Sequence, residues 1–269
     1  NGVAFGSNIN AYTSFSETVY NLSDVPTNKP GLVDSCLLVL HDWSDYLLLS
    51  PEEIDAERGV ITEEWRTRRN AGFRIQRQMF PVLFKGSRYA VRDVIGDLDV
   101  IKNFEYETLR NFYHDWYRTD LQAVVVVGDV DLDVLEAQVK ERFSGIKAVE
   151  VENYRELEGY KVPEHEETYY VLATDKEASQ SSISIYTIHD NKDEKEKTLN
   201  DMREMYIVDL YNSMLRIRIS ELLQKGTPPF IMGQSAYSNF VRFYDAYVIN
   251  VTANPNEEDV ALEAILTET

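Results

Sequence analysis

The chain has 269 residues, of which 43% are hydrophobic, and this is enough apolar material for a substantial buried core. Its 46 Asp and Glu residues outnumber its 27 Lys and Arg residues, so the formal charge is −19, which excludes nucleic acids and anionic membrane surfaces as partners. No apolar run approaches the roughly 18 to 20 residues that span a bilayer, so we expect a soluble protein.

The cysteine content limits the chemistry further. Cys36 is the only cysteine, so neither an intramolecular disulfide nor a cysteine zinc cage can form within the chain. The sequence begins with Asn1 rather than Met, and we therefore expect further sequence upstream.

The first half of the chain alternates predicted strands and helices. Aromatic and β-branched residues predict a short strand near 11–20, and apolar residues three to four apart predict a helix over 31–49. A hydroxyl cap, a first-position proline and a third-position acid coincide in the sequence Ser-Pro-Glu-Glu at 50–53. A second helix is therefore predicted over 51–69.

A third helix is predicted over 103–117, after an irregular stretch. The segment 121–127 is almost wholly apolar and β-branched, which predicts a strand that is buried on both faces. Asp131 is placed to cap a further helix that ends near Gly145. The stretch 147–166 is rich in Glu and Lys and indicates an exposed linker.

The second half carries four predicted strands and two predicted helices. The strands cover 169–174, 181–189, 230–237 and 240–252, and the helices cover 199–223 and 257–269. Strands and helices mix in both halves without the glycine fingerprints of nucleotide-binding folds, so the predicted class is α+β. The acidic linker divides the chain into two predicted domains, 1–155 and 156–269.

Two acids on the second helix are candidate site residues. Seven residues of a helix turn through about 700°, so Glu57 and Glu64 point within about 20° of each other, two turns apart. Such a stripe is most often a solvated acidic face. The alternative is that one carboxylate binds a metal ion and the other orients a neighbouring ligand, and helix geometry does not choose between the two.

The segment 57–64, with the sequence ERGVITEE, resembles a specific element of the inverted-motif zinc peptidases, the M16 family of pitrilysin, insulin-degrading enzyme and mitochondrial processing peptidase. In that family a His-x-x-Glu-His helix supplies two zinc ligands and the general base, and the last acid of an E-R-x-V-I-x-x-E element supplies the third ligand. The resemblance implies that Glu64 is a zinc ligand and that Glu57 is the catalytic-site acid that supports the ligands.

A second segment strengthens the resemblance. Asn10, Ala11 and Tyr12 resemble the family's Asn-Ala-aromatic-Thr edge strand, whose main chain pairs with an extended substrate. Backbone pairing of this kind is β-augmentation, in which ladder hydrogen bonds hold a peptide. Further segments that are similar to the family follow in the expected order, at 83–89, 125–129 and 214–218.

The resemblance implies two mixed α/β domains of the processing-peptidase type, the first lacking its N-terminal strand and catalytic helix. It implies zinc as cofactor of the complete protein, an extended peptide or small protein as substrate, and a second homologous half or subunit that closes the site. Both histidine ligands and the base are missing from the sequence, so the chain by itself is expected to bind no zinc and to be inactive. The compartment is open, with the periplasm of a bacterium as one expectation.

Two other readings stay open. The chain is a noncatalytic half that binds peptides or supports an active partner, as the family includes such subunits, or it is an acidic structural module without a peptide site. Retention of both Glu57 and Glu64 at the family's spacing favours the peptidase reading.

Overall fold

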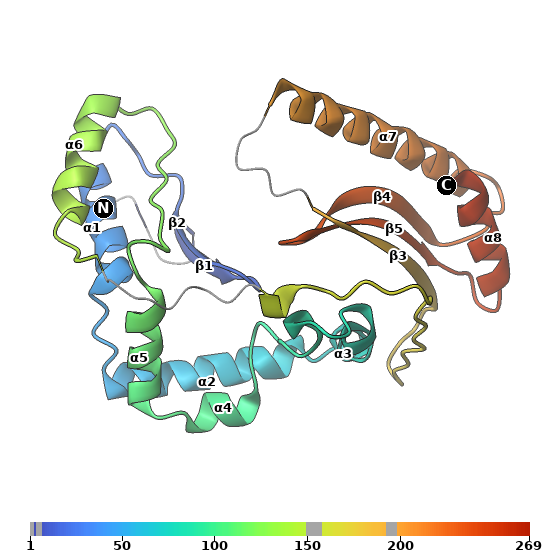
Figure 1. Cartoon of the computed structure of the whole chain (residues 1–269), viewed down its shortest axis with the longest axis horizontal. Coiled ribbons are helices and arrows are strands. Elements are labelled where there is room, and N and C mark those ends of the chain that lie inside the picture. Colours follow the sequence, from blue (N-terminus) through green and yellow to red (C-terminus); the bar gives the residue numbers. More distant parts are fainter. Residues whose placement is uncertain (1–2, 4–6, 149–157, 192–197) are drawn as a thin grey trace. The chain divides into compact units, whose positions relative to one another are not determined.

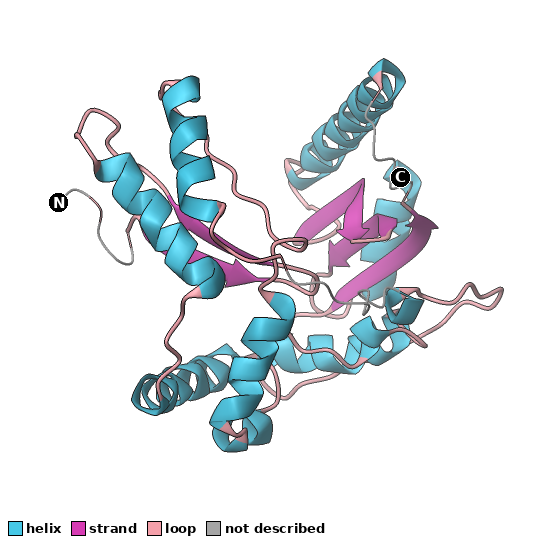
Figure 2. Cartoon of the chain, turned by 60° about the vertical axis from the view of Figure 1, so that its left-hand side comes forward, coloured by secondary structure: helices cyan, strands magenta, loops and turns pink. Residues whose placement is uncertain are grey.

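The computed structural model describes residues 3, 7–148, 158–191 and 198–269, and it confirms the α+β class (Figures 1 and 2). Its helices and strands follow in chain order as β1 (Ile9–Thr13), β2 (Thr18–Leu22), α1 (Leu32–Asp45), α2 (Pro51–Arg68), α3 (Ala71–Leu83), α4 (Leu98–Asn103), α5 (Tyr106–Trp116), α6 (Leu132–Phe143), β3 (Ser182–Asp190), α7 (Leu199–Leu223), β4 (Met232–Val241), β5 (Tyr244–Thr252) and α8 (Glu258–Glu268). Short 3-10 turns cover Arg88–Ala90 and Glu158–Tyr160. None of the helices in the described part has the length and apolarity that crossing a bilayer requires.

The chain divides into two compact units, and the division is not contiguous. Unit 1 comprises 1–69 with 88–159, and unit 2 comprises 70–87 with 160–269. The segment 70–87, which the sequence places in the first of two contiguous domains, thus groups with unit 2. It contains α3, a helix that the sequence did not predict.

Unit 1 contains the β1–β2 hairpin and five helices among its described residues. The predicted start of α2 is confirmed, because the side chain of Ser50 accepts a hydrogen bond from the backbone N–H of Glu53. The single strand expected near 11–20 is instead a hairpin, since the chain reverses between Thr13 and Thr18. The helix expected over 103–117 is interrupted, because Phe104 leaves the helical conformation and α5 starts afresh at Tyr106.

The predicted buried strand 121–127 is wrong. This segment is not part of any ladder, and the side chains of Val125 and Val127 are 78% and 92% exposed. Its composition suits a central strand, but a strand forms only beside a hydrogen-bonding partner. Among the described residues, β1 and β2 pair only with each other, and the segment 121–127 joins neither of them.

Unit 2 is built on a three-stranded antiparallel sheet of order β3-β5-β4. One face packs against α7 and α8, where Ile219, Val251 and Ile265 belong to the buried core. The opposite face packs against the segment that contains α3, because the ring of Phe84 stacks on Phe240 with centroids 5.3 Å apart. Figure 1 shows α7 running along this sheet. Covering both faces explains why 70–87 belongs to unit 2.

The predicted strands of this half are confirmed except one. The helix over 199–223 matches α7, and the predicted hairpin matches β4 and β5, with its turn shifted to 242–243. The segment 169–174 forms no strand, and its Tyr170 and Leu172 are 87% and 89% exposed. Like 121–127, this segment has a strand-like apolar composition but pairs with none of the described strands.

Candidate functional site

The two predicted acids lie on the exposed side of α2. The inner stripe of this helix contains Ile54, which is buried, and Arg58, whose side chain is only 14% exposed. Glu64 is half-exposed, and one of its carboxylate oxygens lies 2.5 Å from Nη2 of Arg68. Glu57 is exposed. Both acids are therefore accessible to solvent. This arrangement is compatible with a solvated helix face and with a partial metal site that other ligands complete.

Arg58, the second residue of the 57–64 element, has more contacts than the sequence suggested. Its Nη1 and Nη2 donate to the backbone carbonyls of Ile101 and Phe104, each at 2.5 Å, and its Nε donates to Asp55 at 3.1 Å. Its guanidinium also lies 3.8 Å from the centroid of the Phe104 ring. Arg58 thereby ties α2 to the C-terminal end of α4.

The hairpin determines which main-chain groups of β1 face outward. The N–H of Ser14 donates to the carbonyl of Glu17, and the N–H of Ser23 donates to the carbonyl of Asn8. In an antiparallel pair, hydrogen-bonded and non-hydrogen-bonded residue pairs alternate. Continuing this alternation inward, the backbone groups of Asn10 and Tyr12 point toward β2.

The backbone of Ala11, with that of Ile9 and Thr13, consequently points to the other edge of β1. No described strand pairs with that edge. The N–H of Ala11 donates instead to its neighbour's side-chain oxygen, Asn10 Oδ1, at 2.8 Å. Tyr12 is 56% exposed beside this edge. Of the three predicted substrate-binding residues, Ala11 therefore presents the main-chain groups, Asn10 covers one of them, and Tyr12 offers a side chain.

The five predicted residues all lie in unit 1, on two separate elements. Among the described residues, no hydrogen bond or ion pair joins Glu57 or Glu64 to Asn10, Ala11 or Tyr12. The sequence did not reveal that Arg58 anchors α2, or that Ala11 rather than its neighbours faces the free edge. A turn between Thr13 and Thr18 is the signal that would have predicted the outward direction of Ala11, because the turn sets the register of the hairpin.

A complete zinc site needs more ligands than the described residues supply. Catalytic zinc takes three protein ligands, usually with imidazole among them. Glu64 has the right donor chemistry for one ligand, but within the described ranges no group of three or more His, Cys, Asp or Glu side chains converges. The nitrogen Nδ1 of His41 lies 3.0 Å from Asp42, and that of His165 lies 2.7 Å from the carbonyl of Glu167. Among the described residues, Glu64 thus fits one ligand position of a zinc site, and no hydrolytic step follows from it alone.

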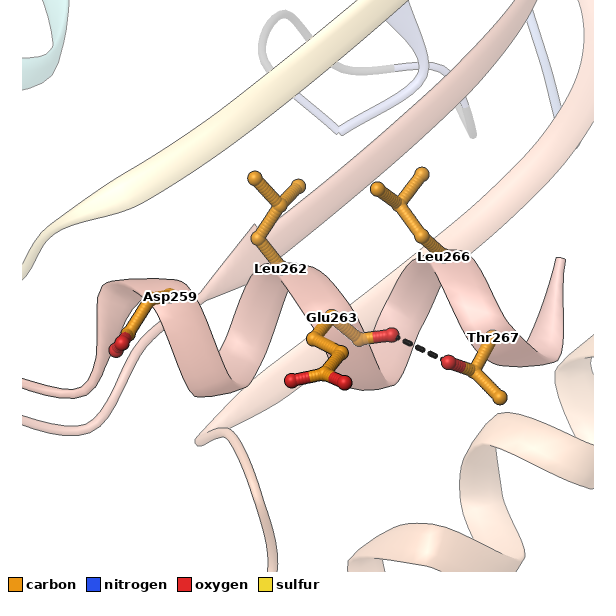
Figure 3. A pocket seen from close by; sticks show the side chains of 5 residues that line it. All are labelled: Asp259, Leu262, Glu263, Leu266 and Thr267. Atoms are coloured by element: carbon orange, nitrogen blue, oxygen red, sulfur yellow. Dashed lines mark hydrogen bonds between the residues drawn. The ribbon is translucent and has the colours of Figure 1, made fainter.

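A shallow hollow on α8 does not coincide with the predicted site (Figure 3). It is lined by Asp259, Leu262, Glu263, Leu266 and Thr267, all from one helix of unit 2. Its only drawn hydrogen bond runs from the Thr267 hydroxyl to the carbonyl of Glu263, at 2.7 Å. It is one face of a helix, with neither a nucleophile beside a base nor a set of metal ligands.

Comparison with known protein families assigns this chain to one of them. A model described as the peptidase M16 inactive domain matches residues 103–268, and one described as insulinase, peptidase family M16, matches residues 3–77. The chain belongs to peptidase family M16. The resemblance found in the 57–64 and 10–13 segments is thereby confirmed at the level of the family, although the roles of their individual residues stay predictions.

Relatives within the M16 family include named zinc proteases. The chain is 29% identical to the probable zinc protease PqqL of Escherichia coli over 99% of its own length and 28% of the relative. It is 31% identical to a zinc protease PQQL-like protein of Arabidopsis thaliana over 85% of its length and 24% of the relative. The chain therefore spans about a quarter of these curated M16 relatives.

Solved M16 structures match the fold over nearly the whole chain. The first half of the periplasmic protease PqqL from Escherichia coli has a TM-score of 0.83 at 27% identity, covering 98% of this chain and 55% of that one. The ferredoxin protease FusC, solved in complex with Arabidopsis ferredoxin, has a TM-score of 0.77 at 22% identity, covering 98% of this chain and 29% of that one. The FusC match shows the common fold alone.

Proposed function

We propose that this chain is part of a zinc-dependent endopeptidase and holds an extended peptide along the free edge of β1. The observation that carries this proposal is the outward-facing backbone of Ala11 on an edge strand without a described partner. Ladder hydrogen bonds to such an edge bind peptides of many sequences, while exposed side chains such as Tyr12 contribute selectivity. An incoming carbonyl would replace Asn10 Oδ1 at the N–H of Ala11.

The proposal assigns the metal to Glu64 together with ligands from sequence upstream of Asn1. Glu64 supplies one zinc ligand in the complete protein, Glu57 supports the ligands from the same stripe, and the two histidines and the base come from sequence upstream. Zinc bound there would activate a water molecule for peptide hydrolysis.

The proposal extends two properties of relatives to this chain. Because the Escherichia coli relative is called a periplasmic protease, we place the complete protein in the periplasm. Because that relative is solved both as a first half and as a longer protein, we propose that a second, homologous half closes the site over an extended peptide or small protein.

The alternative is a noncatalytic half that binds peptides or supports an active partner. The match of residues 103–268 to a model described as an inactive domain favours it. The free edge of β1 would serve this function without any metal. The two candidates therefore differ in the metal ligands and share the peptide-binding edge.

Reading the gene upstream of Asn1 separates the candidates, and a variant pair then tests the peptidase. We expect a His-x-x-Glu-His segment upstream and chelator-sensitive cleavage of peptides by the extended protein. Glu64→Gln should abolish zinc retention, whereas Glu63→Gln should retain it, because Glu63 points about 100° away from Glu64 and pairs with Arg66 at 2.8 Å. Absence of the upstream segment would favour the noncatalytic half. Zinc retention and activity at the wild-type level in Glu64→Gln would instead mean that Glu64 is not a zinc ligand.

A further inference from the structure

We infer that Arg58 is a positioning residue of the proposed site: by holding α2 against the end of α4, it sets the direction of the stripe that carries Glu57 and Glu64. This inference rests on the proposed function and deepens it. Arg58 touches neither the metal nor the peptide in this proposal, and it acts through the orientation of its helix.

Arg58 donates hydrogen bonds to carbonyl groups that the end of α4 leaves without partners. The last carbonyls of a helix have no partner within the helix. The helix α4 ends at Asn103, and Arg58 donates to the carbonyls of Ile101 and Phe104 at 2.5 Å each. These carbonyls also carry the negative end of the helix dipole, which favours a cation beside them.

The Arg58 guanidinium is fixed by three hydrogen-bond acceptors and one aromatic ring. Its Nε donates to Asp55 Oδ1 at 3.1 Å, and the hydroxyl of Tyr106 donates to the other oxygen, Asp55 Oδ2, at 2.7 Å. The ring of Phe104 lies 3.8 Å from the guanidinium carbon. Three acceptors and one ring face match the planar fork of arginine, and a lysine ammonium cannot reproduce this arrangement.

The contact between Arg58 and α4 also fixes the direction of the two acids. Successive helix residues are about 100° apart, so Glu57 lies about 100° and Glu64 about 120° from Arg58, both on the same side. A fixed Arg58 therefore fixes the direction of both acids, whereas a rotation of α2 would swing both together. Metal ligands require such fixed orientation, because small displacements of a ligand weaken coordination.

The test compares two arginine substitutions in the extended, complete protein. Arg58→Lys keeps the charge and removes the fork. Arg142→Lys is the matched control, because Arg142 donates at 3.0 and 2.5 Å to both oxygens of Asp34, in the same unit and away from α2. Zinc retention against a chelator, kcat and KM for a peptide, and thermal midpoints are measured for both proteins and for the wild type.

We expect Arg58→Lys to lower zinc affinity by roughly 10- to 100-fold and to lower kcat while KM stays unchanged, because the β1 edge is not touched. Arg142→Lys should lower the thermal midpoint and leave zinc affinity and kcat unchanged. Tyr106→Phe, which removes only the hydrogen bond to Asp55, should give a smaller loss of zinc affinity in the same direction and serves if Arg58→Lys does not fold.

Other outcomes overturn the inference in distinguishable ways. If Arg58→Lys or, failing its folding, Tyr106→Phe retains zinc and kcat at the wild-type level, Arg58 only stabilises the packing, and the proposed function stands. If the complete wild-type protein binds no zinc, the proposed function fails and the positioning role fails with it.

Discussion

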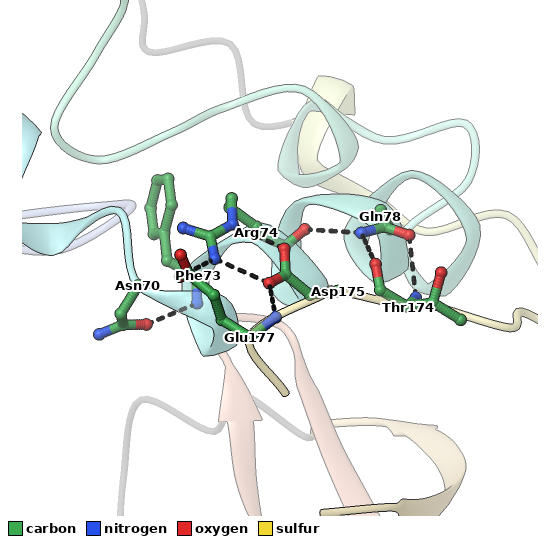
Figure 4. A network of polar contacts seen from close by, with 7 residues as sticks. All are labelled: Asn70, Phe73, Arg74, Gln78, Thr174, Asp175 and Glu177. Atoms are coloured by element: carbon green, nitrogen blue, oxygen red, sulfur yellow. Dashed lines mark hydrogen bonds and ion pairs between the residues drawn. The ribbon is translucent and has the colours of Figure 1, made fainter. Parts of the chain in front are cut away.

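The guanidinium of Arg74 on α3 donates hydrogen bonds to both carboxylate oxygens of Asp175, at 2.6 and 2.7 Å, although the residues are 101 positions apart (Figure 4). The same guanidinium donates to Glu177 at 2.5 Å. One turn further along α3, the Gln78 carboxamide exchanges hydrogen bonds with both backbone groups of Thr174. These contacts attach α3 to the segment 174–177, so unit 2 is held together by residues from both of its chain segments.

Replacing Arg74 should destabilise unit 2 more than replacing an exposed arginine. Arg74→Lys loses the bidentate contact to Asp175, whose side chain is only 10% exposed, so we expect a clear fall in the thermal midpoint. Arg66→Lys is the control, because the side chains of Arg66 and its partner Glu63 are 70% and 62% exposed and such pairs contribute little. Equal thermal midpoints for the two variants, measured by circular dichroism, would contradict a stabilising role for the Arg74–Asp175 contact.

The Arg74–Asp175 ion pair should also lose its stabilising effect in acid. Hydrogen bonds from Arg74 hold the pKa of Asp175 well below its usual value. A depressed folded-state pKa contributes stability above the unfolded-state pKa, and this contribution is lost as the pH falls below about 4. Denaturant unfolding should therefore find Asp175→Asn less stable than the wild type at neutral pH, with the difference shrinking in acid. A difference that is constant with pH would refute the assignment.

Gly59→Ala should stabilise the chain. Gly59 lies inside α2, and a Cβ there would meet no atom within 4 Å, so the change should raise the free energy of unfolding by about 1 kcal/mol. Gly86→Ala is the contrasting variant, because Gly86 has a φ of +86° and its Cβ would lie 2.8 Å from Pro163 Cγ. We expect Gly86→Ala to lower the free energy of unfolding. Urea unfolding of both variants should therefore give changes of opposite sign in this free energy.

Tyr113 should make stability fall at high pH. Burial raises the pKa of its phenol to about 12, and its hydroxyl donates to the carbonyl of Trp43 at 2.8 Å. A raised folded-state pKa contributes stability below the unfolded-state value of about 10, and this is lost as the pH rises toward 12. Tyr113→Phe should cost about 1 to 2 kcal/mol at neutral pH and should reduce the alkaline loss. Identical alkaline profiles for the two proteins would contradict this.

The free edge of β1 can be tested at a single backbone atom. Ala11→Pro removes the outward N–H and leaves the hydrogen bonds between β1 and β2 intact, which edge strands tolerate. In the extended protein we expect it to raise KM for a peptide. Ala11→Val keeps the N–H and should leave KM near the wild-type value. An unchanged KM in Ala11→Pro would mean that the peptide binds elsewhere.

Local signals in the sequence predicted most helix positions. The Ser-Pro-Glu-Glu cap marks the start of α2, and Asp131 caps α6 by accepting from the backbone N–H groups of Asp133 and Val134. These signals act within one turn and need no distant partner, which is why they succeed. The missed helix α3 had such a cap in Asn70, but Pro81 inside the helix argues against it by the usual rules.

Strands were predicted less well because their stability depends on a second segment. The segments 121–127 and 169–174 have the apolar, β-branched pattern of strands, yet both stay unpaired and exposed. The same limit applied to the candidate site. The stripe of Glu57 and Glu64 follows from helix geometry, whereas the outward face of Ala11 depends on the pairing of β1 with β2.

The sequence by itself determined the capped starts of α2 and α6, the shared direction of the two acids on α2 and the resemblance to the M16 family. These features depend on short-range periodicity and on residue order, which involve only residues that are close together in the chain. Only the tertiary structure decided that 70–87 joins unit 2, that Arg58 caps α4 and that Ala11 faces a free edge. Each of these is a contact between residues far apart in the chain, and such contacts depend on which surfaces meet once the helices and strands have formed.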